Sequence, residues 1–325
     1  MPKTPPKTTD VKADIYTRVT ERILADLAQG VRPWAKPWGG THSAERLRRP
    51  IRHNGLPYAG VNVLLLWSQA QDKGYRSPMW MTYNQAQEFG GQVRKGEAGS
   101  LVVYANRFTK TEANDKGEDV ERQIPFMKGY TVFNVDQIDG LPPQYQPADS
   151  LPIPPMPPTQ LHAAAEAFVA ATDATIIHGG DRACYSIEFD FIALPPVAAF
   201  RDAESYQATK LHELIHWSGS ESRNARQFGK RFGDNAYAFE ELVAELGAAF
   251  LCADLGISAE IRDDHAAYLS HWLTVLQQDK RAIFAAASHA QRAVDYLHSL
   301  QPAARPMAAP STSAAEHATA ELAEV

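Results

Sequence analysis

The clearest hydrophobic pattern near the start of the chain is an apolar stripe with helical spacing. Ile15, Val19, Ile23 and Leu27 recur every four residues, which predicts a helix that ends before Gly30. Apolar residues with similar periodicity predict further helices at residues 60–73, 82–89, 159–172, 203–217, 238–255, 260–278 and 280–300.

Strands are predicted where apolar and polar residues alternate or a short apolar run is bounded by turn residues. Four such runs occur, at Ser100–Arg107, Gly129–Val135, Ala174–His178 and Ser186–Leu194. The first two flank a charged, glycine-containing segment around residues 114–121, which is typical of a hairpin tip. Helices and strands together predict an α+β protein.

A proline-rich stretch at residues 139–158 divides the chain. Proline at this density excludes a regular helix and favours an extended linker. The predicted organisation has five parts: a flexible N-terminus at 1–10, an α+β domain at 11–138, the linker at 139–158, a second domain at 159–300, and a disordered Ala/Pro/Ser/Thr-rich tail at 301–325.

Composition narrows the class of protein. Of 325 residues, 44% are hydrophobic and 22% charged, which is globular composition. The two cysteines, Cys184 and Cys252, cannot form a disulfide framework, and without a C-x-x-C motif a cysteine-based zinc site is excluded. The N-terminus lacks the apolar core of a signal peptide and no run is long enough to span a bilayer, so we expect a cytoplasmic protein without a membrane partner.

The net charge of −6 argues against a nucleic-acid partner, but its distribution reverses that interpretation. Residues 1–140 hold 20 Lys+Arg and 15 Asp+Glu, giving +5, whereas the remaining 185 residues hold 12 and 23, giving −11. A basic binding module joined to an acidic one would show this asymmetry. A chance distribution of solvated charges is the alternative.

The strongest chemical signal is the motif H-E-L-I-H at residues 212–216. Residues four apart share one face of a helix, so His212 and His216 can hold one zinc ion together. Glu213 follows His212 directly and is expected to act as a general base on a zinc-activated water. A histidine pair with no metal is the alternative, but the apolar neighbours of the motif favour a buried active-site helix.

A catalytic zinc needs a third protein ligand, and the segment 239–251 offers three candidates. Glu241 and Glu245 are four residues apart and share a helix face. We expect Glu241 to bind the metal and Glu245 to orient a ligand histidine or to replace Glu241, with Glu240 as a further competitor. A solvated acidic stripe is the alternative. One Zn²⁺ per chain is predicted, and Mn²⁺ or Co²⁺ is not excluded.

Aromatic and basic side chains are interleaved in the first 140 residues, a mixture that suits single-stranded nucleic acid. Bases stack on exposed rings while cations follow the phosphates. Trp34 and Trp38 lie in a Pro/Gly-containing loop, which favours function over packing, whereas core packing is the alternative for every tryptophan. The predicted DNA-binding residues are Trp34, Lys36, Trp38, Arg52, Tyr58, Arg94, Lys95 and Lys110.

Several ordered motifs resemble the ArdC-type antirestriction proteins of conjugative plasmids. The resemblance covers most of residues 12–300. In the first domain it is carried by R-P-W-A-K-P-W (32–38), Y-A-G-V-N-V-L-L-L (58–66), S-P-M-W-M-T-Y-N-Q-A (77–86) and V-R-K-G-E (93–97). In the second domain it is carried by F-I-A-L-P-P (191–196), H-E-L-I-H-W-S-G (212–219) and Y-A-F-E-E-L-V-A-E-L-G-A-A-F-L (237–251).

The resemblance implies a single-stranded-DNA-binding domain followed by a zincin-like metallopeptidase domain. The latter is gluzincin-like and similar in architecture to SprT/Spartan-type DNA-dependent proteases. It also implies protection of incoming plasmid DNA from host restriction, and a protein substrate that is DNA-bound or restriction-related. The E-x-x-x-[DE] pattern of such peptidases implies Glu241 as the zinc ligand, although Glu245 is longer than the aspartate often found at its position.

Two other functions stay open at this point. The protein could coat single-stranded DNA without catalysis and use zinc only to stabilise its fold. A metal-dependent nuclease is also conceivable, but nucleases use carboxylate-rich magnesium sites or paired metals, whereas this motif is rich in histidine.

Overall fold

The computed structural model describes residues 9–35, 47–113, 119–145, 158–228, 235–258 and 265–302. Its α-helices are α1 Thr9–Ala28, α2 Val61–Lys73, α3 Tyr83–Glu88, α4 Pro158–Ala170, α5 Ala203–Ser218, α6 Asn235–Leu255, α7 His265–Gln278 and α8 Ala282–Ser299. Its strands are β1 Ile51–Arg52, β2 Met79–Met81, β3 Gln92–Val93, β4 Ser100–Ala113, β5 Asp119–Asn134, β6 Ile138–Asp139, β7 Thr175–His178, β8 Cys184–Ser186 and β9 Phe191–Leu194. In the described part, no helix could span a membrane.

The N-terminal domain is built on a small mixed sheet with the strand order β1-β2-β5-β4. β1 and β2 are parallel, while β5 is antiparallel to both β2 and β4. The short strands β3 and β6 form a separate antiparallel pair. A two-domain α+β architecture is thereby confirmed.

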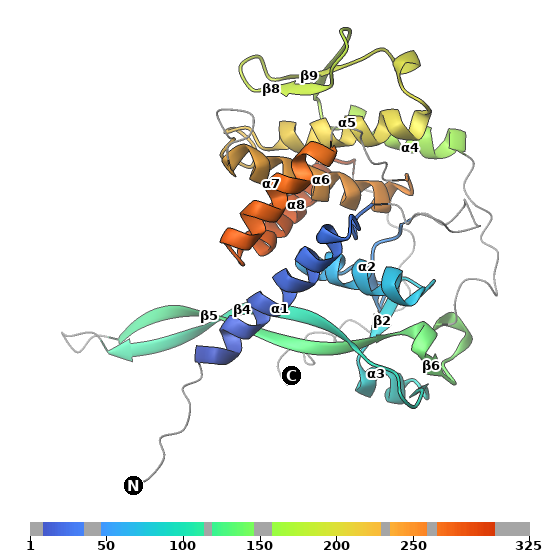
Figure 1. Ribbon diagram of the computed structural model, residues 1–325, viewed down its shortest axis with the longest axis vertical. Helices are drawn as coiled ribbons and strands as arrows, with labels where there is room; N and C mark the ends of the chain where they lie inside the picture. Colours follow the sequence, from blue (N-terminus) through green and yellow to red (C-terminus); the bar gives the residue numbers. More distant parts are fainter. Residues whose placement is uncertain are drawn as a thin grey trace.

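The hairpin of β4 and β5 is longer than the sequence predicts. Its register runs from Ser100 opposite Val132 to Ala113 opposite Asp119. In the outer half, Arg107, Thr109 and Gln123 are exposed on one face of the ribbon, and no run of buried apolar residues marks this part of the sequence as a strand. The hairpin leaves the body of the molecule as a long ribbon (Figure 1).

The C-terminal domain places a three-stranded sheet over a stack of helices. Its strand order is β7-β9-β8, with β7 parallel and β8 antiparallel to β9. The single strand predicted at Ser186–Leu194 is wrong: the chain reverses between β8 and β9. Asp190 adopts a left-handed φ of 51° in that turn, a conformation that aspartate tolerates better than most residues.

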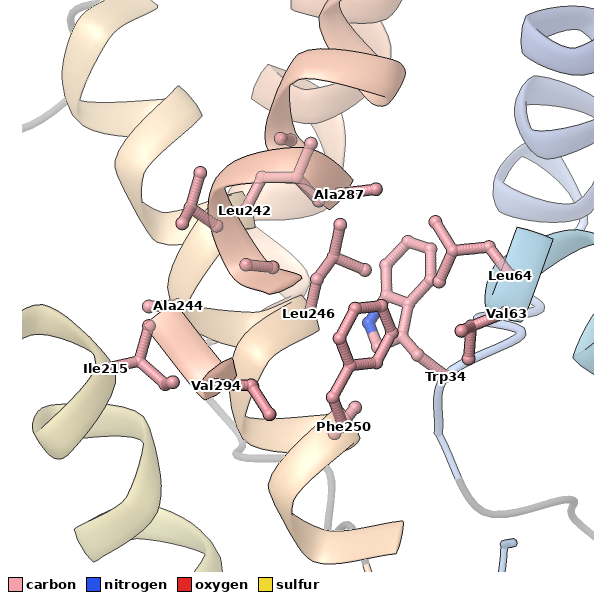
Figure 2. Packing of buried hydrophobic residues seen from close by; sticks show 14 of the residues in the cluster. Trp34, Val63, Leu64, Ile215, Leu242, Ala244, Leu246, Phe250, Ala287 and Val294 are labelled. Carbon is pink, nitrogen blue, oxygen red and sulfur yellow. The ribbon is translucent and has the colours of Figure 1, made fainter. Parts of the chain in front are cut away.

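The larger of the two hydrophobic clusters among the described residues extends across both domains. Trp34 of the N-terminal domain lies between the α2 side chains Val63 and Leu64 and the α6 side chains Leu246 and Phe250 (Figure 2). Burial of large apolar side chains stabilises by roughly 1.5–3 kcal/mol each, so a shared core of this kind couples the domains tightly.

Helix α1 also packs onto the C-terminal domain. Tyr16 forms an edge contact with Phe284 of α8, with ring centroids 4.7 Å apart. Thr20 donates a hydrogen bond of 2.7 Å from Oγ1 to the backbone oxygen of Lys280, which precedes α8. The N-terminal domain is therefore fixed against the helices that surround the predicted metal site.

Candidate metal centre

Two neighbouring helices, α5 and α6, carry the predicted metal ligands. α5 begins at the N-cap Asp202, whose carboxylate accepts a hydrogen bond of 2.8 Å from the backbone N–H of Ser205. From there the helix continues without a break through His212 and His216. Both histidines are buried, and α6 presents Glu241 to them.

The three side chains converge as the sequence predicts. His212 Nε2 lies 3.5 Å from Glu241 Oε2, and His216 Nε2 lies 3.5 Å from Glu241 Oε1. One donor atom from each residue falls within 4.8 Å of the others. Metal bonds of about 2.0–2.2 Å in a tetrahedral site separate neighbouring donors by roughly 3.3–3.6 Å. The donor set and its spacing therefore fit a divalent metal.

A second carboxylate supports His216 from behind. Glu240 Oε1 lies 3.1 Å from Nδ1 of His216, on the side of the ring away from Glu241. Arg226 donates three hydrogen bonds to Glu240, from Nη2 at 2.8 Å and from Nε at 3.1 and 3.2 Å. Glu240 therefore faces Nδ1 of His216, whereas Glu241 faces Nε2.

Glu245 stands in the corresponding place behind His212. Its Oε2 lies 3.8 Å from His212 Nδ1, too long for a direct hydrogen bond but within the distance of an ion pair with a protonated imidazole. Its Oε1 accepts a hydrogen bond of 3.3 Å from the indole N–H of Trp34. Each predicted ligand histidine thus has Glu241 at Nε2 and a different carboxylate at Nδ1.

These charges shift the pKa values of the site in opposite directions. Burial disfavours the charged imidazole of His216, but the hydrogen bond with Glu240 and the charges of Glu241, Glu240 and Glu213 outweigh it and raise the pKa to about 8. Burial also favours the neutral acid of Glu241, but the hydrogen bond with His212 and the charge of His216 outweigh it and lower that pKa to about 2. Without a metal, these shifts favour a protonated imidazole at His216 beside a charged carboxylate at Glu241.

Glu213 is buried beside His212 on α5. Its charge acts on His216, and it also acts on Cys184 of β8, where burial is the larger cause and Glu213 the smaller cause of a raised thiol pKa. The carboxylate is therefore close enough to both His216 and Cys184 for its charge to act on them.

Sequence reasoning missed one member of the site. Arg226 lies in the segment after α5 and is buried, and it also donates to Ile215 O at 2.6 Å and to Ser218 Oγ at 3.0 Å. Arg226 lies in an irregular segment, where no helical or strand periodicity predicts burial. Its partner Glu240 is brought to it only by the packing of α6 against α5.

Two of the predicted DNA-binding residues, Trp34 and Tyr58, are buried. The stacking role of Trp34 is wrong, because its side chain is only 1% exposed and packs against Trp272 with ring centroids 6.2 Å apart. Tyr58 is also buried beneath the Arg52 guanidinium, and this burial raises the pKa of its hydroxyl to about 12. Neither ring can offer a face to a base in this structure.

Of the six other predicted DNA-binding residues, three are exposed basic residues and three have side chains outside the described part of the structure. Arg52, Arg94 and Lys95 are exposed. Arg94 pairs with Glu97 at 2.8 Å and with Asp139 at 3.5 Å, which reduces the positive charge available at that point. Lys110 lies in β4 with its side chain outside the described part, and Lys36 and Trp38 lie outside the described residues altogether.

Comparison with known proteins assigns both domains. Residues 13–133 match the N-terminal domain of anti-restriction factor ArdC, and residues 163–289 match a zincin-like metallopeptidase domain. The chain is 40% identical over 300 residues to the uncharacterized protein y4eC of Sinorhizobium fredii (strain NBRC 101917 / NGR234), which covers 91% of this chain and 95% of that protein. It is also 37% identical over 304 residues to the DNA primase TraC of Escherichia coli, of which it spans only 27%.

Solved structures agree with this assignment. The metal-free crystal structure of the antirestriction ArdC protein from plasmid R388 aligns with a TM-score of 0.72 at 47% identity, covering 89% of this chain and 98% of that chain. The Mn(II)-bound structure of the same protein aligns with a TM-score of 0.70 at 44% identity and the same coverage. The chain therefore belongs to the ArdC antirestriction family, with an ArdC-type N-terminal domain followed by a zincin-like metallopeptidase domain.

Proposed function

We propose that the protein binds single-stranded DNA and hydrolyses peptide bonds at a metal held by His212, His216 and Glu241, thereby protecting incoming plasmid DNA from restriction. One observation carries the peptidase part: in the described part of the chain, the converging donor set has three members. Structural zinc sites use four protein ligands, whereas catalytic sites use three and leave a position for substrate or water. Three donors therefore support catalysis over a purely structural metal.

Zinc is the metal we propose. Two histidines and one glutamate form the ligand set of several zinc peptidases, with an open position. The R388 relative was crystallised with Mn(II), and imidazole and carboxylate donors also accept manganese and cobalt. The proposal for zinc therefore rests on the donor chemistry, and metal analysis of the purified protein is its direct test.

A bound divalent metal would polarise the scissile carbonyl and acidify the attacking water. Glu213 would accept the proton of that water and deliver it to the leaving nitrogen, since it is buried beside His212 on the same helix. Glu240 and Glu245 would favour the imidazole tautomers with hydrogen on Nδ1, which leaves both Nε2 atoms facing Glu241.

The substrate would bind along β8. Among the described strands, β8 lies at the edge of its sheet and pairs only with β9, and Cys184 is close enough to Glu213 for the carboxylate charge to act on its thiol. An extended peptide can add to such an edge through backbone hydrogen bonds. We therefore propose an extended segment of a protein that is DNA-bound or restriction-related as the substrate.

For the DNA-binding part, we propose the β4–β5 ribbon as the stacking surface in place of Trp34. The register sets Tyr104, Phe126 and Tyr130 on one face of β4 and β5. Tyr104 lies 6.0 Å from Phe126 and 6.3 Å from Tyr130 between ring centroids, and Lys128 Nζ lies 5.9 Å from the Phe126 centroid. Half-buried rings beside a lysine suit base stacking combined with a phosphate contact.

The exposed Arg52 and Lys95 would add phosphate contacts, in keeping with the charge of +5 over residues 1–140. We expect the protein to act in the cytoplasm, because its partner is DNA and both cysteines are free.

The decisive experiment compares Glu213→Gln with the matched surface variant Glu221→Gln. Glu213→Gln should retain stoichiometric metal while peptide hydrolysis falls by about two to four orders of magnitude, because the general base is lost. Glu221 is exposed, so its variant should cleave like the wild type. Unchanged hydrolysis by Glu213→Gln would remove the mechanism. Full protection of DNA in cells by the same variant would favour the non-catalytic coating function.

A further inference from the structure

We propose that Trp34, a residue of the N-terminal domain, is a positioning residue of the metal centre in the C-terminal domain. The inference rests on the proposed metal site and goes beyond it, because it makes that site a product of both domains. Trp34 acts through Glu245, and Glu245 acts on His212.

The contact chain is short and buried. The indole N–H of Trp34 donates to Oε1 of Glu245 at 3.3 Å, and Oε2 of the same carboxylate lies 3.8 Å from Nδ1 of His212. Trp34 and Glu245 are both buried. One carboxylate therefore faces the N-terminal domain with one oxygen and the proposed metal ligand with the other.

Arg32, two residues before Trp34, strengthens the same connection. Its Nη1 lies 3.7 Å from Glu245 Oε1, and its side chain is largely buried. A cation and a neutral N–H donor from one loop thus converge on a single oxygen of Glu245. A buried carboxylate needs such partners, since the loss of one leaves part of its desolvation cost uncompensated.

Packing holds the Trp34 donor in place. The ring is fixed against Trp272 and between the α2 and α6 side chains described above (Figure 2). The direction of the N–H is therefore set by the core shared between the domains. A phenylalanine could fill most of the ring's volume but could not donate to Glu245.

The effect on the metal centre follows from the histidine. A carboxylate facing Nδ1 favours the tautomer with hydrogen on Nδ1, and the Nε2 lone pair is then directed toward Glu241 and the metal. Without the Trp34 N–H, Glu245 loses a fixed donor and can turn away from His212. The affinity for a divalent metal should then fall, although neither metal ligand nor general base has been changed.

The test measures metal affinity of the full chain, using Mn²⁺ alone and Zn²⁺ alone in competition with a chelator. Trp34→Phe should weaken affinity by about tenfold, the lower end of the effect of losing a group that orients a ligand. Trp67→Phe is the matched control, because this buried tryptophan belongs to the same core and contacts Phe250 but donates to the backbone oxygen of Arg48. It should bind both metals like the wild type.

A second variant separates positioning from packing. Glu245→Gln should weaken affinity at least as much as Trp34→Phe, and the double variant Trp34→Phe/Glu245→Gln should be no weaker than Glu245→Gln, since both changes break one chain of contacts. The low-temperature EPR spectrum of bound Mn²⁺ should change in Trp34→Phe but not in Trp67→Phe. Additive losses, or wild-type affinity in Trp34→Phe, would overturn the inference.

The outcomes also distinguish this inference from the proposed function. If the wild type binds no stoichiometric metal, or if His216→Ala binds metal like the wild type, the proposed metal site itself is wrong. If both behave as expected and Trp34→Phe and Trp67→Phe bind metal equally, only the positioning role of Trp34 fails. Should Trp34→Phe not fold, Arg32→Gln tests the same oxygen of Glu245 with the same expected loss.

Discussion

Gly247 of α6 lies directly against Ile215 of α5. A methyl group on the Cα atom of Gly247 would be 2.8 Å from Cδ1 and 2.9 Å from Cγ1 of Ile215, closer than carbon atoms pack. Ile215 precedes His216, and Gly247 follows Glu241 by less than two helical turns. The contact therefore sets how closely α6 can bring Glu241 to the two histidines.

Gly247→Ala should destabilise the protein and weaken metal binding together. The added methyl overpacks the α5–α6 contact at a cost of about 1–3 kcal/mol, which exceeds the roughly 1 kcal/mol that alanine gains in a helix. Urea unfolding and a metal titration measure the two effects. Gly247→Ala/Ile215→Val should recover part of both, because valine lacks Cδ1; a stability gain in the single variant would contradict the packing argument.

Arg226→Ala should be among the most destabilising substitutions in the C-terminal domain. It removes all the donors that Arg226 supplies to Glu240 and leaves that carboxylate buried beside His216. Breaking a buried pair in this way costs about 3–5 kcal/mol. Urea unfolding of the metal-free protein provides the measurement, and a loss below about 1 kcal/mol would show that Glu240 finds another partner. Arg226→Lys keeps the positive charge but lacks the planar guanidinium group. Its free energy of unfolding should fall between those of the wild type and Arg226→Ala.

Metal affinity should rise with pH up to about 8 and then level off. His216 has its pKa raised to about 8, so a metal must displace its proton at lower pH. Chelator competition from pH 6 to 9 should show close to a tenfold change in affinity per pH unit below 8. Glu240→Gln should move the plateau to lower pH, because the hydrogen bond and charge that raise the pKa are lost. A constant metal affinity between pH 6 and 8 would show that His216 does not lose a proton when the metal binds.

The same proton has the opposite effect on the fold without metal. The folded pKa of His216 is above its ordinary value of 6.5, so the group stabilises the metal-free protein fully below pH 6.5. That contribution is lost as the pH rises through about 8. The metal-free wild type should therefore lose more stability between pH 6 and 9 than His216→Ala does, as measured by urea unfolding.

Substitution of the three neighbouring glutamates should rank their roles. Glu241→Ala should abolish stoichiometric metal binding, because a donor of the metal itself is lost. Glu240→Ala and Glu245→Ala should weaken binding by about 10–100-fold through the histidines that they face. Metal analysis after dialysis gives the ranking. If Glu241→Ala retained the metal and Glu245→Ala lost it, Glu245 would be the metal ligand and Glu241 the supporting carboxylate.

DNA binding should depend on the ribbon and the exposed cations rather than on Trp34. Tyr104→Ala should weaken binding to a single-stranded oligonucleotide by about 1–3 kcal/mol, whereas Trp34→Phe should leave it unchanged, because the latter ring is buried. The logarithm of the binding constant falls linearly with the logarithm of the salt concentration. Lys95→Ala and Arg52→Ala should each make that slope shallower by about 0.7, because each removes one phosphate contact. Fluorescence anisotropy at several salt concentrations, with duplex as a weaker-binding control, tests these expectations.

Much of the site is readable from the chain because it depends on distances along one helix. His212 and His216 are one turn apart on α5, and their shared face follows from helical geometry alone. Glu241 and Glu245 share a face of α6 for the same reason. Helix boundaries are also close to expectation, as for α5, because capping residues and periodic apolar positions act locally.

Sequence alone determined the α+β class, the histidine pair, its glutamate neighbours and the family to which the chain belongs. Tertiary structure decided which carboxylate faces which imidazole nitrogen, because residues such as Glu240 and Glu241 point about 100° apart on a helix and only the position of α5 selects between them. It also decided that Trp34 is a core residue: an aromatic ring in a loop is equally suited to stacking on a base or to burial, and the packing of the two domains against each other determined which occurs.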